Sequence, residues 1–263
     1  MISVYLALKF ELMLDLIKSI INKFGGRPAG SESEKKAQLY FKEHLSSFCN
    51  SVNIYEFKAP LNARFGSLKW FALIYFICFV LYPYNHLVSV IVSFFNGFLF
   101  FFHFVFFKEW LNFLFKKKSS WNVSGDIKPK EAVKRTIILS GHMDSVYEFH
   151  WWYWFKQAGV VFTVLGSASL LLQCLLLSLI YLSSTYSIGI EMFLWTILAV
   201  LSPCVLTVGI MRGNKPVDGA LDNLSALALV SDIGKFFVEN PLKNTKLKLI
   251  SFGSEETGLK GSS

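Results

Sequence analysis

The stretch IILSGHMDS, residues 137–145, places an unbroken apolar run directly before a histidine and an aspartate. Such a run is typical of a strand that is covered on both faces of a sheet. Two further polar clusters, GALDN at 219–223 and FGSEETG at 252–258, also adjoin segments that look buried. Because sites in open α/β sheets lie at the carboxyl ends of strands, we expect the three clusters to meet there. One imidazole with several carboxylates is a ligand set that suits zinc.

The composition is unusual for a soluble domain. Of the 263 residues, 53% are hydrophobic and 17% aromatic, with 27 phenylalanines, which is more apolar than an ordinary soluble domain. The net charge of +8 would suit nucleic acid. However, the polar segments carry no basic stripe interleaved with aromatic residues, so we expect no nucleic-acid partner. The four cysteines show no CxxC spacing, which argues against a disulfide framework or a zinc ribbon.

Two long apolar insertions separate the polar clusters. The first contains the runs 68–82 and 87–107, and the second contains 158–182 and 186–211, joined by the uncharged turn Ser183-Ser184-Thr185. A helix of roughly 20 residues spans the 30 Å or so of a bilayer core. We therefore expect two transmembrane hairpins, at 67–107 and 158–211, and the lipid bilayer as a partner. Trp70 and Tyr82 suit the membrane interfaces, and His103 is expected to pack between helices.

The charges that flank the insertions predict their orientation. Basic residues lie on the side of the polar segments, and the two short turns on the far side carry none; the basic residues are Arg64, Lys69, Lys108, Lys116, Lys117, Lys118, Lys156, Arg212 and Lys215. The positive-inside rule then predicts an integral membrane protein whose polar, catalytic portion is cytoplasmic. Two crossings separate His142 from Asp222, so both lie on one side and can share a site.

The polar remainder, at 1–66, 108–157 and 212–263, predicts an α/β fold with a mixed, largely parallel sheet. Strands are expected at 52–59, 122–127, 135–140 and 246–252, and helices at 12–24, 31–48 and 223–239. Ser31 and Glu34 form a capping-box pattern at the start of the second helix. The two membrane hairpins interrupt this single domain.

The polar clusters carry a family resemblance. His142-Met143-Asp144, Asp222-Asn223, Glu255-Glu256 and the GLKGS turn at 258–262 follow one another in the order of a known motif set. In these motifs, and in the RPAGS turn at 27–31, the chain resembles the co-catalytic zinc aminopeptidases of metallopeptidase family 28, which also includes glutamate carboxypeptidase-like members. The resemblance covers essentially all of the polar chain.

The resemblance implies a role for each motif residue. His142 would bind one zinc ion, Glu256 a second, and Asp222 would bridge both, so two zinc ions are expected in the complete protein. Asp144 would hydrogen-bond the ligand imidazole and fix its tautomer. Glu255 would be the general base that takes a proton from water activated by zinc.

The chain departs from the family pattern at its end. The family supplies two further ligands, an acid and a histidine, downstream of the paired glutamates, whereas this chain stops at Ser263. We therefore expect an N-terminal fragment with a partial zinc site and a sheet that is incomplete at its C-terminus, with an unpaired edge and an uncovered apolar face. Leu221 and Ala226 also replace the family's more usual polar and glycine residues.

Three functions are consistent with these residues. The first is a membrane-bound zinc metallopeptidase with a peptide substrate, releasing N-terminal residues as an aminopeptidase. The second is a catalytically inactive homologue that serves as a membrane scaffold or receptor. The third is a glutaminyl-cyclase-like enzyme with a single zinc ion. Retention of all five acidic and histidine residues of the motifs favours the first function over the second. The sequence indicates neither a side-chain preference nor an oligomeric state.

Overall fold

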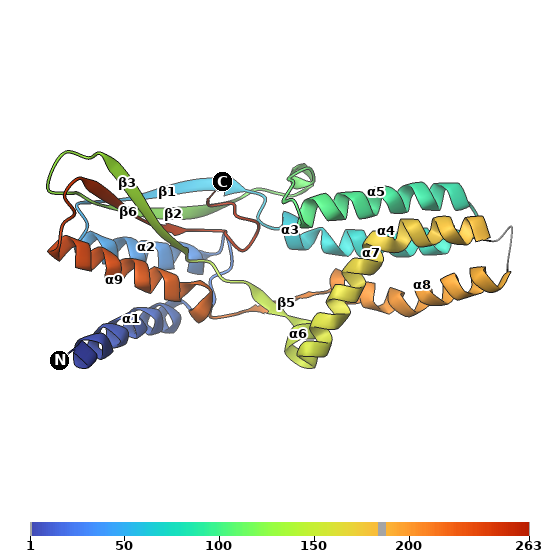
Figure 1. Cartoon of the computed structure of the whole chain (residues 1–263), viewed down its shortest axis with the longest axis horizontal. Helices are drawn as coiled ribbons and strands as arrows, with labels where there is room; N and C mark the ends of the chain where they lie inside the picture. The colour runs from blue at the N-terminus through green and yellow to red at the C-terminus, as the bar shows by residue number, and fades with distance from the viewer. Residues whose placement is uncertain (1, 184–187, 263) are drawn as a thin grey trace. The chain divides into compact units, whose positions relative to one another are not determined.

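A computed structural model describes residues 2–183 and 188–262 of the chain, so Ser184 and Thr185 of the predicted turn lie outside the described residues. The chain forms two compact units, which are described separately. The first, here called the sheet unit, consists of Met1–Leu61, Lys116–Tyr147 and Lys215–Ser263. The second, the helical unit, consists of Asn62–Phe115 and Glu148–Asn214. The elements of both units are labelled in Figure 1.

The sheet unit is built on four strands in the order β1 (Ser51–Ala59), β2 (Lys118–Ile127), β6 (Thr245–Phe252) and β3 (Arg135–His142). β3 and β6 pair in parallel, while β1 with β2 and β2 with β6 pair antiparallel. The sheet is mixed, as predicted, but the expectation that it is largely parallel is wrong for the described strands. Of the three pairings between the described strands, that of β3 with β6 is parallel.

Three helices complete the sheet unit: α1 (Ile2–Phe24), α2 (Glu32–Ser46) and α9 (Ser225–Glu239). The predicted cap of α2 is present, because the Ser31 side chain accepts the Glu34 backbone N–H at 3.1 Å. α2 and α9 pack on one face of the sheet (Figure 1). Their apolar side chains form the core with alternate residues of β2 and β6, as the period of two in a half-buried strand requires.

The burial of β3 differs from the prediction. Ile137 is 45% exposed and Ile138 is 58% exposed, whereas the apolar run predicted a strand covered on both faces. These successive residues point to opposite faces of the sheet, so both faces are partly open at this part of β3, which is an edge strand of the described sheet. The expected unpaired edge and uncovered apolar face are therefore present in the part of the sheet that the structure describes.

The helical unit contains α3 (Ala63–Gly66), α4 (Leu68–Leu81), α5 (His86–Phe104), the short helix η1 (Asn112–Leu114), α6 (His150–Phe155), α7 (Gln157–Ser183) and α8 (Ile188–Gly209). The short strands β4 (Tyr147–Phe149) and β5 (Arg212–Pro216) pair with each other. Among the residues that the structure describes, four helical stretches are long and apolar enough to cross a membrane: Ala63–Leu81, His86–Phe104, Gln157–Leu182 and Ile188–Gly209. These are the segments in which the sequence predicted membrane spans.

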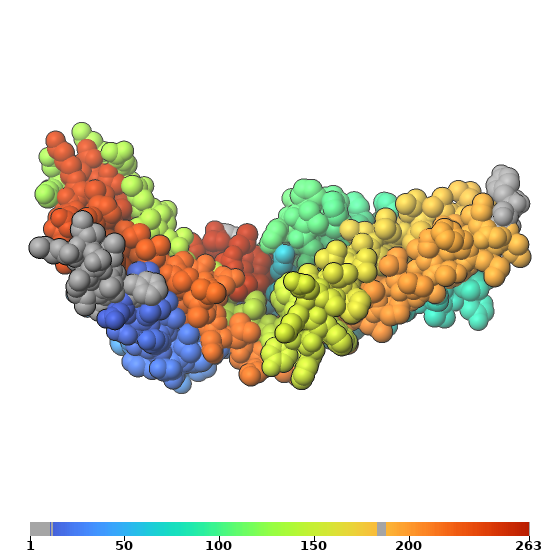
Figure 2. All heavy atoms as spheres, turned by 60° about the horizontal axis from the view of Figure 1, so that its bottom comes forward, coloured from blue at the N-terminus to red at the C-terminus, as the bar shows by residue number. Residues whose placement is uncertain are grey.

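Packing within the helical unit is apolar. α7 and α8, yellow and orange in Figure 2, lie against each other, and α4 and α5 also contact α7. His103 is buried with its ring against Phe71 and Phe104, which confirms its predicted place between helices. Tyr82, which was expected at a membrane interface, is 3% exposed, and its hydroxyl donates to the Leu177 carbonyl of α7 at 3.2 Å. This contact joins the C-terminal end of α4 to α7.

Candidate metal centre

The parallel pairing of β3 with β6 determines where the site lies. His142 is in register with Phe252, so both strands end at the same edge of the sheet. The Met143 backbone N–H then donates to the Phe252 carbonyl at 2.8 Å, which keeps the two outgoing loops together. The prediction that the clusters at 140–145 and 252–258 meet at strand ends is confirmed. This is the edge at which α/β sheets place their sites.

Three side chains converge at this edge on a space of the size that a metal ion takes. His142, Asp222 and Glu256 each offer one ligand atom, and these atoms lie within 4.8 Å of one another. Asp222 comes from the turn Ala220–Leu224 before α9, in which the Asp222–Asn223 peptide bond is cis. His142 is 5% exposed, while the Asp222 side chain is 76% exposed. The site is therefore buried on the side of His142 and open to solvent on the side of Asp222.

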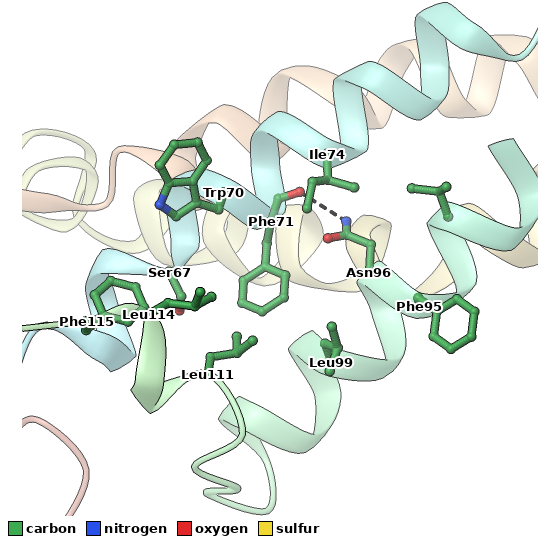
Figure 3. A pocket seen from close by; sticks show the side chains of 11 residues that line it. Ser67, Trp70, Phe71, Ile74, Phe95, Asn96, Leu99, Leu111, Leu114 and Phe115 are labelled. Atoms are coloured by element: carbon green, nitrogen blue, oxygen red, sulfur yellow. Dashed lines mark hydrogen bonds between the residues drawn. The ribbon is translucent and has the colours of Figure 1, made fainter. Parts of the chain in front are cut away.

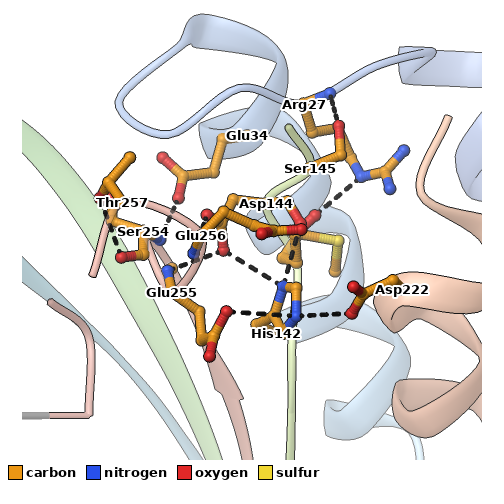
Figure 4. Close-up of polar contacts among 12 residues, drawn as sticks. Arg27, Glu34, His142, Asp144, Ser145, Asp222, Ser254, Glu255, Glu256 and Thr257 are labelled. Carbon is orange, nitrogen blue, oxygen red and sulfur yellow. Dashed lines mark hydrogen bonds and ion pairs between the residues drawn. The ribbon is translucent and has the colours of Figure 1, made fainter. Parts of the chain in front are cut away.

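Glu255 lies beside this group but on the other side of the imidazole (Figure 4). Its Oε2 is 3.5 Å from His142 Nε2, and Asp222 Oδ1 is 3.2 Å from the same nitrogen. Both glutamates lie in the turn that follows β6, Glu255 beside His142 Nε2 and Glu256 in the group with His142 and Asp222.

Asp144 is fully buried beneath the site, in contact with His142 as predicted. His142 Nδ1 lies 3.0 Å from the Asp144 backbone carbonyl and 3.4 Å from the carboxylate Oδ1. The carboxylate has a second function that the sequence did not indicate. Its Oδ1 accepts the backbone N–H of Glu255 at 3.0 Å, and its Oδ2 accepts that of Glu256 at 3.1 Å. One aspartate therefore orients the imidazole and both glutamates.

The charges of the site fit a bound cation. Burial lowers the pKa of His142, but the hydrogen bond to Asp144 and the negative charges of Asp144, Glu255 and Glu256 outweigh it and raise the pKa to about 9. The pKa of Glu256 is raised to about 7, first by burial and then by the charges of Asp222, Asp144 and Glu255, against the lowering effect of His142. Clustered carboxylates repel one another without a cation between them. One imidazole with two carboxylates is a donor set that zinc prefers.

Arg27 is a residue of this region whose contacts the sequence did not predict, although its turn contributed to the family resemblance. The side chain is fully buried. Its Nε donates to the Met143 carbonyl at 2.9 Å and its Nη2 to the Asp218 carbonyl at 2.8 Å, while its backbone N–H donates to Ser145 Oγ at 2.9 Å (Figure 4). Arg27 therefore joins the loop that follows His142 to the loop that precedes Asp222.

Glu34 is a second residue whose contacts the sequence did not predict, because we interpreted it only as part of a capping box. Its Oε1 accepts the Ser254 backbone N–H at 2.9 Å and the Ser120 hydroxyl at 2.9 Å, and its Oε2 accepts the Gly30 N–H at 2.7 Å. Gly253 is required beside it, because a Cβ there would come within 2.7 Å of Glu34 Oε1 and 2.5 Å of the Trp121 carbonyl. No local pattern marks a carboxylate whose partners are backbone groups far along the chain.

Comparison with known proteins gives structural neighbours only. No family model and no curated protein sequence matches the chain. Among solved structures, glutaminyl cyclase from Tannerella forsythia is similar over 92% of this chain and 45% of its own, with 12% identity and a TM-score of 0.44. The aminopeptidase from Aneurinibacillus sp. strain AM-1 is similar over 96% and 64%, with 14% identity and a TM-score of 0.47.

A zinc aminopeptidase from Bacillus subtilis is similar over 96% of this chain and 63% of its own, with 14% identity and a TM-score of 0.45. The chain thus spans less than two thirds of the length of each of these three proteins. The structural neighbours are zinc aminopeptidases and glutaminyl cyclases, at low identity. Because this similarity is low, any proposal about function must rest on the residues of the site.

Proposed function

We propose that this chain belongs to a membrane-bound zinc metallopeptidase that hydrolyses peptide bonds as an aminopeptidase. The observation that supports the proposal most strongly is the convergence of His142, Asp222 and Glu256 within 4.8 Å, with Glu255 next to them. These residues come from three separate parts of the sequence. A solvated acid or a helix cap would explain each residue alone, but neither explains their meeting around one buried imidazole.

The chain's own residues would divide the work as follows. His142 Nε2 and the carboxylates of Asp222 and Glu256 would hold zinc, which when bound lowers the pKa of water to about 7 and polarises a carbonyl. Asp144 accepts from His142 Nδ1 and so leaves Nε2 as the ligand nitrogen. The Glu255 carboxylate, 31% exposed, would take a proton from the attacking water and pass it to the leaving amine.

A glutaminyl-cyclase-like function is the second candidate, and one observation favours it. Within residues 2–183 and 188–262, the structure brings together one group of three metal-ligating side chains, which suits a single ion. A bridging role of Asp222 and a second zinc ion would require further ligands. The two functions differ in their products: a cyclase releases ammonia from a peptide with N-terminal glutamine, whereas an aminopeptidase releases a free amino acid.

The setting in the membrane is also part of the proposal. The four apolar helices of the helical unit support integration into a bilayer. The basic residues that flank them support a cytoplasmic position of the metal centre, under the positive-inside rule. A peptide substrate would then reach the centre from the aqueous side, where Asp222 is exposed.

The test is to replace Glu255 with glutamine and to measure both bound zinc and hydrolysis of aminoacyl substrates. Because the change removes a proton acceptor and not a ligand, zinc content should be unchanged, while turnover falls on the order of 10²- to 10⁴-fold. His142→Ala should lose the metal. Glu131→Gln, at an exposed glutamate paired with Lys243, is the matched control. Near-normal turnover in Glu255→Gln would refute the assignment, and a protein that binds no zinc would favour the inactive scaffold.

A further inference from the structure

A cavity of about 420 Å³ lies in the helical unit between α4, α5 and the segment that contains η1 (Figure 3). Its wall includes Trp70, Phe71 and Ile74 of α4, Leu99 of α5, and Leu111 and Leu114 around η1. The volume lies within the roughly 300–1,000 Å³ of small-molecule sites. None of these residues belongs to the metal centre, and the proposed function does not use the cavity.

The wall offers almost nothing to a polar ligand. Only two lining side chains other than Trp70 carry polar groups: Ser67 Oγ donates to the Arg64 carbonyl at 2.8 Å, and Asn96 Nδ2 donates to the Phe71 carbonyl at 3.1 Å. Asn96 is itself buried and ties α5 to α4 (Figure 3), and its Oδ1 is a single acceptor that no described residue pairs. A peptide or a nucleotide would lose the hydration of many polar groups in such a cavity and could regain a hydrogen bond only at this one acceptor. A hydrocarbon chain would lose nothing.

A positive charge lies next to the wall. Lys69 precedes Trp70, and its Nζ is placed over the Trp70 ring, 5.4 Å from the ring centroid. Lys69 is exposed, and Trp70 is 52% exposed. α4 and α5 both belong to stretches that are long and apolar enough to span a membrane. A hydrocarbon-lined cavity beside a lysine at the end of a span combines a place for an acyl chain with a place for an anionic headgroup.

We propose that this cavity binds one acyl chain of an anionic phospholipid, with the phosphate of the headgroup at Lys69. The chain occupies the space between α4, α5 and η1, and the lysine provides the preference over zwitterionic lipids. A lysine close to an anionic lipid contributes a preference of about five-fold in binding. This site is independent of the metal centre, and it uses residues of the helical unit alone.

Fluorescence of Trp70 tests the proposal directly, because this side chain lies in the cavity wall. The full chain is prepared with phenylalanine at the other six tryptophans (Trp110, Trp121, Trp151, Trp152, Trp154 and Trp195) and placed in bilayers that contain brominated phosphatidylglycerol or brominated phosphatidylcholine. Bromine on the acyl chain quenches a tryptophan that it contacts. Half-maximal quenching should need about five-fold less of the anionic lipid than of the zwitterionic one.

Variants separate a bound lipid from lipids that surround the helices generally. Lys69→Gln should make the two quenching curves coincide. Ile74→Phe and Leu99→Phe fill the cavity from two different helices, and each should remove the preference, so one suffices if the other fails to fold. Ile77→Phe is the matched control, because Ile77 is 49% exposed on α4 and does not line the cavity. Equal quenching by both lipids in the parent protein, or a preference that survives both filling variants, would overturn the proposal.

Discussion

The carboxylate of Glu34 accepts the backbone N–H of Ser254 at 2.9 Å, although 220 residues separate the two in sequence. Ser254 directly precedes Glu255 and Glu256, so the loop that carries both glutamates is attached to the first turn of α2. Burial and, secondly, the charge of Asp144 raise the pKa of Glu34 to about 8, against the lowering effect of the hydrogen bonds from Gly30, Ser120 and Ser254. Burial of the Glu34 carboxyl group is unfavourable by itself, but its hydrogen bonds fix the loop that carries Glu255 and Glu256.

Replacing Glu34 by alanine should therefore both destabilise the protein and weaken the metal centre. Three donors lose their acceptor, and an unsatisfied buried donor costs about 1–3 kcal/mol. Thermal unfolding and zinc titration of the variant measure the two effects. Glu32→Ala, at an exposed glutamate of the same helix, is the control and should stay within about 0.5 kcal/mol of the parent. Unchanged zinc affinity in Glu34→Ala would show that Ser254 does not position the glutamates.

Asp144→Asn tests the residue that contacts most of the site. The amide retains one acceptor oxygen, whereas the carboxylate serves the backbone N–H groups of both Glu255 and Glu256 and the His142 imidazole. We expect zinc affinity to fall about 10- to 100-fold, the usual cost of losing a group that orients a metal ligand. Asp126→Asn makes the same chemical change at a residue paired with Lys246, away from the centre, and should leave zinc affinity unchanged. Equal losses in both variants would contradict this role of Asp144.

The hydrophobic pattern and the order of the motifs together indicated the main residues of the site. The apolar runs that end at His142 and Phe252 are strands, and their parallel pairing in the structure places the two strand ends at the same edge of the sheet. Asp222 reaches this edge from the turn before α9. The order of the motifs indicated that His142, Asp222 and Glu256 share a site, and strand pairing brings the first and last of them together. Arg27 and Glu34 could not be found in this way. Apart from Gly25 and Gly30 nearby, their side chains contact backbone groups of Met143, Asp218 and Ser254 and the hydroxyl of Ser120, all of them 86 or more residues away. A local sequence pattern indicates none of these contacts.

Strand order was the part of the fold that the sequence did not determine. The segments at 52–59 and 122–127 were predicted as strands, yet their antiparallel pairing depends on where the helical unit returns the chain to the sheet. The exposure of β3 shows the same limit, because Ile137 and Ile138, on opposite faces of this edge strand, have the apolar character of buried residues and are nevertheless exposed in the described structure. The local hydrophobic pattern predicts that a segment is a strand, but the strands and helices packed against it determine how much of it is buried.

His44 should make the stability of the sheet unit depend on pH. Burial and, secondly, the charge of Lys235 lower the pKa of His44 to about 4. Its Nε2 lies 2.7 Å from Ser231 Oγ of α9. The unfolded chain takes up the proton near pH 6.5 and the folded chain only near pH 4, so stability is full above about 6.5 and is lost as pH falls towards 4. The loss is about 1–3 kcal/mol.

The measurement is chemical unfolding of the full chain at pH 7 and pH 4.5, followed by a probe in the sheet unit such as Trp121. His44→Gln removes the titrating group and keeps a polar partner for Ser231, so this variant should lose less stability over the same pH range. Because other groups also titrate in this range, the test is the difference between the parent and His44→Gln in the change of unfolding free energy from pH 7 to pH 4.5. Parallel slopes for the parent and His44→Gln would show that His44 is not held neutral in the folded protein.

The last prediction concerns the side of the membrane on which the polar segments lie. His142 and Asp222 share one centre, so the segments before and after α7 and α8 must lie on the same side of any bilayer that these helices cross. With the four native cysteines replaced by serine, single cysteines at Lys118 and Lys215 should react with an impermeant maleimide only from the cytoplasmic side, and one at Asn85 only from the opposite side. Two cysteines, at Lys118 and Lys215, that label from different sides would be incompatible with a shared metal centre. Labelling of both from the outside would keep the centre and reverse the orientation that the lysines and arginines predict.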